Sequence, residues 1–168
     1  WSETYKPSPS FVSIHLGVEK SLINKNFNCH HILVEDWDEL ESEKGVIFVS
    51  IPTLLDPSLA PEGKHIIHAF TPSSIDEWEG LSREKYLQKK EEYFSFLVKK
   101  ISKLLPNLDQ NIDHKEIGTP KTHKKFLGRY EGSYGPIPSQ KLLGLLPMPF
   151  NTTKIKNLYC VGDSCFPG

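Results

Sequence analysis

The residues best suited to bind a ligand lie near the end of the sequence, where an apolar run over residues 157–161 leads into Gly162 and Asp163. An apolar run of this length, followed by glycine, predicts a short buried strand. Because glycine has no side chain, a ligand can approach the backbone at Gly162 closely. A carboxylate at the carboxyl end of a strand, such as Asp163, can accept hydrogen bonds from the hydroxyls of a sugar-like ligand.

The residues that follow predict the start of a helix at Pro167-Gly168. The N-terminus of a helix carries partial positive charge, which favours a negative group such as a phosphate. The simpler alternative is that Asp163 caps this helix and binds no ligand. Both alternatives stay open on these residues alone.

Metal binding is suggested by the residue types of Cys29-His30-His31. No second pair of such residues stands at the spacing of a zinc site, so the pattern favours structural roles and no metal. His68 lies in an apolar strand pattern, where a histidine is more often packed in a core than used as an acid. Residue type and spacing therefore identify no catalytic residue.

A basic cluster, Lys121-Thr-His-Lys-Lys125 with Arg129, precedes a run of glycines. The cluster fits a solvated loop, with contact to anionic lipid headgroups as the alternative. The glycine spacing Gly128-x3-Gly132-x2-Gly135 lacks the Lys-Ser/Thr of a phosphate-binding loop, so nucleotide binding is not predicted there.

The elements that would position these residues begin as an antiparallel meander. Residues 11–18 alternate between apolar and polar, which is typical of a half-buried strand. Further strands are predicted over residues 30–35, 46–51 and 64–70, and the segment 46–51 is apolar on both faces, as an inner strand is. Segments rich in Pro, Gly, Asp and Ser separate them, which is turn chemistry.

Helical spacing of apolar residues replaces this alternation over residues 83–105. Ser82 fits the N-cap and Pro106 a stop, and Ser74-Ile-Asp-Glu77 matches the capping box of a short preceding turn. The apolar stripe predicts packing on the core, with a partner-binding zipper as the alternative. After Pro106 we expect a long, loop-rich segment.

The composition limits the classes of protein to which this chain can belong. The 168 residues are 38% hydrophobic and 24% charged, as in a globular domain or a large piece of one. The formal net charge of -1 gives no reason to expect nucleic acid. No apolar run approaches the roughly 20 residues that span a bilayer. Three scattered cysteines predict reduced thiols, and the missing initiator Met predicts a piece of a longer protein.

The last eleven residues, Leu158-Tyr-Cys-Val-Gly-Asp-Ser-Cys-Phe-Pro-Gly168, resemble the C-terminal FAD motif of the phytoene desaturase and carotenoid isomerase group of flavoproteins. Four further stretches resemble the carotenoid cis–trans isomerases of this group. They lie in collinear order at residues 50–63, 73–82, 118–123 and 148–153. The resemblance thus extends over nearly the whole chain.

The resemblance implies an α+β fold: an antiparallel substrate-binding sheet with helices, then the returning strand of a Rossmann-like FAD domain. Residues 1–156 would belong mainly to the substrate-binding domain, with a loop-rich return segment over 106–156. Residues 157–168 would begin the C-terminal FAD-binding segment. The Gly-x-Gly-x-x-Gly loop that binds the ADP half of FAD in such proteins does not occur in the sequence. We therefore expect the C-terminal part of a larger enzyme, cut just inside its FAD motif.

The same resemblance implies a set of binding residues. Those expected to contact FAD, with Asp163 on the ribityl chain, are Gly162, Asp163, Ser164, Pro167 and Gly168. Those expected near the pocket for flavin and polyene are Tyr130, Gly132, Tyr134 and Gly135.

The implied activity is the conversion of poly-cis lycopene towards the all-trans form, using reduced FAD without net redox change. A flavin-dependent desaturase or a retinol-saturase-like enzyme is the alternative on the same scaffold. A non-enzymatic interaction module built on the helix over 83–105 is a second alternative. Because a carotenoid substrate dissolves in lipid, the resemblance also implies peripheral association with a cyanobacterial or plastid membrane surface.

Overall fold

The computed structural model describes residues 6–40, 42–137 and 148–166. The chain divides into two compact units. The larger is Phe11–Thr119, and the described residues of the smaller are 6–10, 120–137 and 148–166. Among the described residues, no helix is long and apolar enough to cross a membrane.

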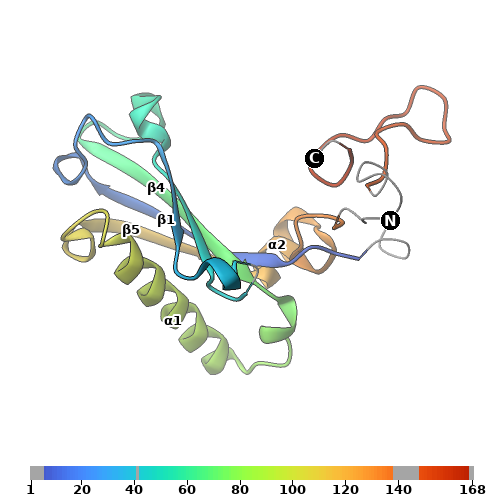
Figure 1. Ribbon diagram of the computed structural model, residues 1–168, viewed down its shortest axis with the longest axis horizontal. Coiled ribbons are helices and arrows are strands. Elements are labelled where there is room, and N and C mark those ends of the chain that lie inside the picture. Colours follow the sequence, from blue (N-terminus) through green and yellow to red (C-terminus); the bar gives the residue numbers. More distant parts are fainter. Residues whose placement is uncertain (1–5, 41, 138–147, 167–168) are drawn as a thin grey trace. The chain divides into compact units, whose positions relative to one another are not determined.

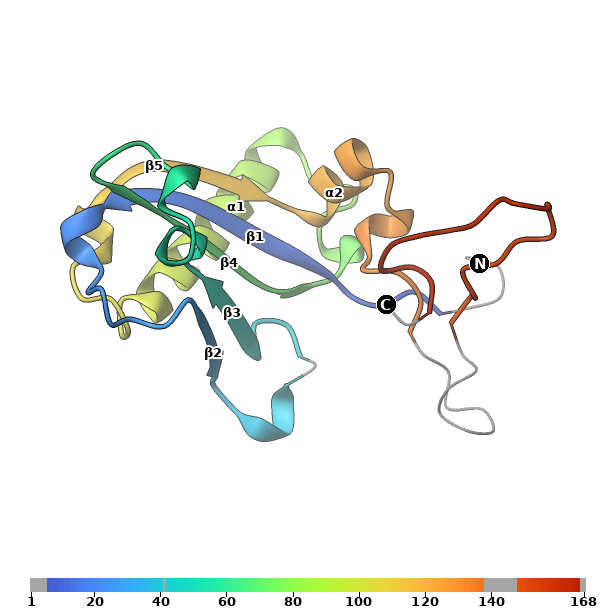
Figure 2. The ribbon, with the colours of Figure 1, turned by 90° about the horizontal axis from the view of Figure 1, so that it is seen from above.

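A five-stranded sheet with the strand order β2-β3-β4-β1-β5 forms the frame of the larger unit (Figures 1 and 2). The strands are β1 (Ser10–Glu19), β2 (His30–Val34), β3 (Val46–Ser50), β4 (Lys64–Ser73) and β5 (Ile112–Gly118). Antiparallel pairing joins β1 to β5, β2 to β3 and β3 to β4. The four strands predicted from alternation and turn chemistry are therefore confirmed, as is the antiparallel α+β fold.

The neighbours β4 and β1 also run in opposite directions. The ring of Phe11 lies against that of Phe70, and the Lys20 N–H donates to the Gly63 carbonyl at 2.9 Å. These two contacts join early β1 to late β4 and the end of β1 to the start of β4, as antiparallel neighbours require.

One face of this sheet packs against the helix α1 (Arg83–Ile101), as Figure 1 shows. The fully buried side chains of this core include Ile14, Leu16, Ile47, Ile67, Leu97 and Ile101. The helical stripe is thus core, as predicted. Ser82 Oγ accepts the Lys85 N–H at 3.3 Å, which confirms the N-cap.

The helix ends earlier than Pro106. Its last regular residue is Ile101, after which the Lys103 and Leu104 N–H groups bond three residues back, to Lys100 and Ile101. This tighter bonding replaces the α-helical pattern before the proline is reached.

Two elements lie where the sequence predicted loops. The strand β5 was not predicted, because it is an edge strand whose central residues are exposed and mostly charged and therefore show no apolar alternation. The helix α2 (Pro120–Leu127) carries the part of the basic cluster over Lys121–Lys125, so the interpretation of that part as a loop is wrong, whereas Arg129 lies in the loop after the helix. Proline is well suited to the first turn of a helix, because its missing N–H is not needed there.

Residues 157–161 do not form the predicted strand. Within the part of the chain that the structure describes, Tyr159 forms one isolated bridge with Thr152, and Asn157 has a left-handed φ of 64°. Leu158, Tyr159 and Val161 are all at least half exposed. An apolar run becomes a strand only where neighbouring strands pair with it and cover it.

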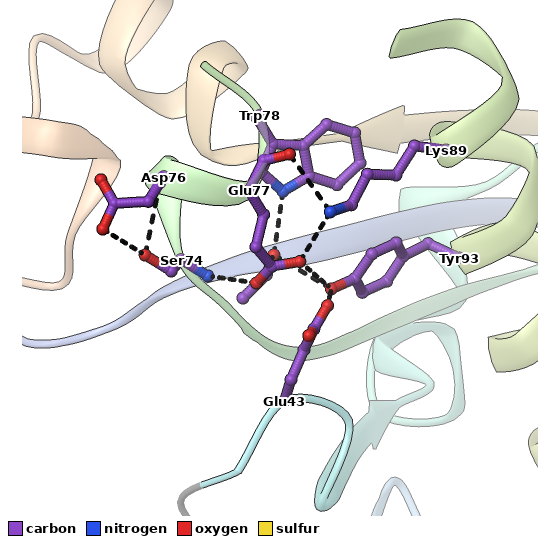
Figure 3. A network of polar contacts seen from close by, with 8 residues as sticks. Glu43, Ser74, Asp76, Glu77, Trp78, Lys89 and Tyr93 are labelled. Atoms are coloured by element: carbon purple, nitrogen blue, oxygen red, sulfur yellow. Dashed lines mark hydrogen bonds and ion pairs between the residues drawn. The ribbon is translucent and has the colours of Figure 1, made fainter. Parts of the chain in front are cut away.

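A polar network links the loop before β3 to α1 and β4 (Figure 3). The predicted capping box is present: the Ser74 N–H donates to Glu77 Oε1 at 3.0 Å, and the Asp76 N–H donates to Ser74 Oγ at 3.3 Å. Lys89 Nζ lies 2.8 Å from Glu77 Oε2. The buried Tyr93 hydroxyl lies 3.1 Å from Glu77 Oε2 and donates to Glu43.

Candidate functional site

The smaller unit brings two loops with sequence-predicted site residues into contact. Gly135 has a φ of +117°, and a Cβ on it would lie 3.1 Å from Ser164 Cα and 3.2 Å from the Asp163 carbonyl oxygen. A side chain at Gly135 would therefore collide with the backbone of the 163–164 turn. The close approach unites the two groups of residues that the resemblance assigned separately to FAD and to the flavin pocket.

An ion pair joins the same two loops. Arg129 Nη2 lies 2.6 Å from Asp163 Oδ2, and Arg129 Nη1 donates to the Ser133 carbonyl at 3.3 Å. The guanidinium also lies over the ring of Tyr134, 5.7 Å from its centroid. Asp163, predicted to accept hydrogen bonds from a ligand, is thus already held by a cation of this chain.

A concavity of about 470 Å³ opens beside this ion pair. Its lining consists of Leu127, Gly128, Arg129, Tyr130, Asp163 and Ser164. Three predicted residues, Tyr130, Asp163 and Ser164, therefore border one cavity. We call these lining residues the Asp163 site.

Other predicted residues have different places. Gly132 has a φ of +69°, and a Cβ on it would lie 2.3 Å from the Pro120 carbonyl oxygen, so this glycine packs against the start of α2. Its carbonyl accepts a hydrogen bond from Ser10 Oγ at 2.6 Å. Gly162, with a φ of +116°, lets the chain turn ahead of Asp163. Pro167 and Gly168 lie outside the described residues.

Tyr134 lies beside the ion pair, and the pKa of its hydroxyl is strongly raised. Burial is the main cause that raises the pKa of Tyr134 to about 12; Arg129 opposes the rise and Asp163 adds to it. The phenol therefore stays protonated at neutral pH and does not act as a base there.

The chemistry available at the Asp163 site follows from its donor set. Asp163 supplies a carboxylate acceptor, Arg129 a planar cation with five N–H donors, and Ser164 a hydroxyl. Such a set can bind a ligand that carries both hydroxyls and negative charge. The sequence gives no local signal for this role of Arg129, because the other basic residues near it are lysines and its partner Asp163 lies 34 positions away.

The second candidate region is the face of the large sheet opposite α1. Side chains alternate across a strand, so the residues between the core positions point to this face. Four rings on three neighbouring strands form a continuous row. Phe48 of β3 stacks on Phe70 of β4 at 4.9 Å, Phe70 lies 5.6 Å from His68 on the same strand, and His68 stacks on His15 of β1 at 4.4 Å. We call these four side chains the aromatic row.

His68 differs from the core histidine that the sequence predicted. It lies in the aromatic row and is half-buried, and the core side of β4 is formed by its neighbours Ile67 and Ala69. Burial is the main cause that lowers the pKa of His68 to about 4, and the charge of His15 adds to the effect. The imidazole is therefore neutral at physiological pH.

Comparison with known proteins gives the following matches. No protein-family model matches the chain. Prolycopene isomerase 2 of an Oncidium hybrid cultivar, a chloroplastic protein, is 54% identical over 170 residues. This match covers 100% of the present chain and 29% of that protein. The chloroplastic prolycopene isomerase of Arabidopsis thaliana is 52% identical, with the same coverage of both.

More distant similarity extends to other enzymes. A 4,4'-diapolycopen-4-al dehydrogenase of Metabacillus indicus is 28% identical, covering 99% of this chain and 35% of that protein. A crystal structure of an oxidoreductase from Methanosarcina mazei aligns with a TM-score of 0.48 at 17% identity, covering 97% of this chain and 30% of that one. At this score the structural likeness supports no inference.

Proposed function

Since this chain is homologous over its whole length to plant prolycopene isomerases, we propose that the protein containing it is a carotenoid cis–trans isomerase. Its substrate would be poly-cis lycopene and its product a lycopene closer to the all-trans form. The reaction would use reduced FAD without net redox change. The chain spans less than a third of the length of these relatives, so part of the proposed site would come from other segments.

The observation that carries the proposal is the aromatic row. A carotenoid is a flat, apolar, conjugated chain, and ring faces offer it a matching surface. Phe48 is 38% exposed, and Ile32, its partner across β2 and β3, is 62% exposed. Exposed apolar side chains gathered on one sheet face mark a surface that binds an apolar ligand or another protein segment. We assign the face to the polyene.

The chemistry required is rotation about a carbon–carbon double bond, which is slow until the bond order falls. Transient protonation of one polyene carbon by an acid lowers that order and leaves a cation delocalised along the chain. Loss of a proton to the conjugate base after rotation restores the double bond, so there is no net redox change. The negative faces of the rings of Phe48 and Phe70 would stabilise this charge, and burial against them would exclude water. Reduced FAD, when bound, would supply negative charge, which favours formation of a cation.

The Asp163 site would hold the cofactor. Its carboxylate suits ribityl hydroxyls, and the backbone at Gly162 and Ser164 suits close approach of the pyrophosphate. Pro167 and Gly168 would continue this segment. The donor set fits the cofactor because it combines an acceptor for hydroxyls with a cation for phosphate.

Location follows from the substrate and the relatives. The most similar of the relatives above are described as chloroplastic, which supports a plastid location. Since lycopene dissolves in lipid, we propose that the protein works at a membrane surface, without a role for nucleic acid.

The test is to incubate the full-length protein anaerobically with poly-cis lycopene in liposomes, with and without dithionite. We expect isomerised product of unchanged mass, formed only after reduction. A product lighter by two hydrogens would instead indicate a desaturase, and one heavier by two hydrogens a saturase. Equal isomerisation with oxidised flavin would contradict the requirement for reduction.

A matched pair of variants tests the aromatic row. Phe70→Leu keeps apolar bulk but removes the ring, so we expect isomerisation to slow by roughly two- to thirtyfold, the range of one cation–π contact. Phe126→Leu is the control, because Phe126 is 72% exposed and lies on α2. If both variants behave like the parent, the polyene does not bind over the row.

A further inference from the structure

Arg129 is the residue that connects all parts of the Asp163 site. Its two Nη atoms make separate contacts, one with Asp163 and one with the Ser133 carbonyl, while its plane lies over Tyr134. Ser133 is 3% exposed, and its Oγ donates to the Tyr130 carbonyl at 2.7 Å. The guanidinium therefore spans from a buried turn to an exposed carboxylate.

We infer that Arg129 is the positioning residue of the Asp163 site: it fixes the Asp163 carboxylate against the 133–135 turn in the arrangement that receives the cofactor. The inference rests on the proposed function, because it takes FAD as the ligand. The chemistry that Arg129 would assist is the binding of a ribityl phosphate, and the carboxylate remains the group that accepts the hydroxyls.

To position the Asp163 carboxylate, residue 129 needs the two separate Nη donors of a guanidinium group. The Asp163 side chain is 43% exposed, and an exposed ion pair by itself contributes little to stability. The planar guanidinium bonds a carboxylate and a carbonyl at the same time, in a fixed geometry. The ammonium group of lysine cannot reproduce this geometry. Lysine should therefore keep the charge and lose the positioning.

Charge gives Arg129 a second effect on the ligand. Without the guanidinium, Asp163 would present an uncompensated carboxylate to a cofactor that carries phosphates. Like charges at this range repel, so the loss of Arg129 should weaken binding through Asp163 itself. This predicts that the effect of Arg129 depends on whether residue 163 is charged.

The experiment is a thermodynamic cycle in the full-length protein, with the FAD dissociation constant measured by fluorescence titration of the flavin-free form. Arg129→Met should weaken FAD binding by roughly tenfold to a hundredfold, the range for hydrogen bonds to a charged group. Arg129→Lys should recover only part of this loss. In an Asp163→Asn background, the loss caused by Arg129→Met should be at least threefold smaller than in the parent, which exceeds the roughly twofold limit of additive behaviour.

Controls separate positioning from general stability. Lys124→Met removes an exposed cation from α2 and should leave FAD affinity unchanged. The melting temperature of each flavin-free variant checks that it folds. If Arg129→Met does not fold, Arg129→Lys is used in its place in both backgrounds. Equal losses from Arg129→Met in both backgrounds, or full recovery by lysine, would overturn the inference. A parent protein that binds no FAD would overturn the proposed function as well.

Discussion

The hydroxyl of Tyr93 in α1 donates a hydrogen bond to the carboxyl group of Glu43, which lies 50 positions earlier in the loop before β3 (Figure 3). Tyr93 is 1% exposed and its hydroxyl also lies 3.1 Å from Ser73 Oγ in β4. One phenol therefore holds together a loop, a helix and a strand of the larger unit.

The first prediction concerns this hydroxyl. Tyr93→Phe should destabilise the chain by about 1–3 kcal/mol, because the variant leaves Glu43 and Ser73 without a partner that they have at present. The free energy of unfolding from urea titration measures the effect. Tyr159→Phe is the control, since Tyr159 is 63% exposed and should change stability by less than about 0.5 kcal/mol. Equal stability of both variants would mean that the network does not hold the loop.

The second prediction concerns the two carboxyl groups beside Tyr93. Hydrogen bonding to Glu77, followed by burial, raises the pKa of Glu43. Burial opposes ionisation of Glu77, but hydrogen bonds from Glu43 and Lys89 hold the pKa of Glu77 well below 4.5. As the pH falls, Glu43 is therefore the first of the two carboxyl groups to bind a proton.

The signs of the two effects differ. Glu77 binds fewer protons when folded, so its stabilising contribution is present above pH 4.5 and is lost as the pH falls through its lowered pKa. Glu43 binds more protons when folded, so its contribution is present below pH 4.5 and is lost as the pH rises through its raised pKa. Glu77→Gln should therefore flatten the acid limb of the stability curve below pH 4.5, measured by urea titration. An unchanged acid limb would contradict the lowered pKa of Glu77.

A third prediction uses His68. Its pKa of about 4 lies below the ordinary 6.5, so between these values the unfolded chain binds the proton and the folded chain does not. The contribution of His68 to stability is thus present above pH 6.5 and lost as the pH falls towards 4. His68→Phe should remove this part of the pH dependence while keeping an aromatic ring in the row. By NMR, the imidazole of His68 should titrate near pH 4, and His15→Ala should move that titration upwards. Titration at 6.5 in the parent would contradict the half-buried placement.

How far the sequence predicts this fold depends on whether the signal is local. The alternation of Val12, Ile14 and Leu16 predicted the buried face of β1, because each strand residue takes its face from its neighbours in the chain. The strand β5 gave no such signal, since its position at the sheet edge leaves its central side chains in solvent. Its place next to β1 depends on pairing across nearly a hundred residues.

The candidate site follows the same rule. Asp163 could be singled out from a local pattern, because a glycine and a carboxylate after an apolar run are recognisable by type, whereas Gly135 was expected near the flavin from the family resemblance alone. Their contact, and the ion pair of Arg129 with Asp163, depend on how two loops fold back on each other. The strand predicted over 157–161 failed for a related reason, since pairing partners decide whether an apolar run becomes a strand.

A fourth prediction tests the close approach at Gly135. Gly135→Ala places a Cβ 3.1 Å from Ser164 Cα at a φ of +117°, so both steric contact and backbone strain oppose it. Gly63→Ala is the matched control, with a φ of +81° and nothing within 4 Å of the added Cβ. The control should cost about 1 kcal/mol from strain alone. Gly135→Ala should cost more, and it should weaken FAD binding to the full-length protein because Ser164 and Asp163 must shift. Equal effects in the two variants would show that the approach of the loops is not required.

The last prediction concerns the chain by itself. FAD binding in dinucleotide-binding folds depends on a glycine-rich loop whose backbone amides and helix dipole hold the pyrophosphate. The Gly-x-Gly-x-x-Gly pattern of that loop does not occur in this sequence, whereas the proposed ribityl contacts around Asp163 do. Contacts to the ribityl chain alone should leave FAD weakly held, so the purified 168-residue chain should lose the cofactor on desalting. Absorbance of the desalted sample in the flavin band measures retention, and the full-length protein treated in the same way is the control. Retention of one flavin per chain would mean that the Asp163 site binds FAD without a separate pyrophosphate loop.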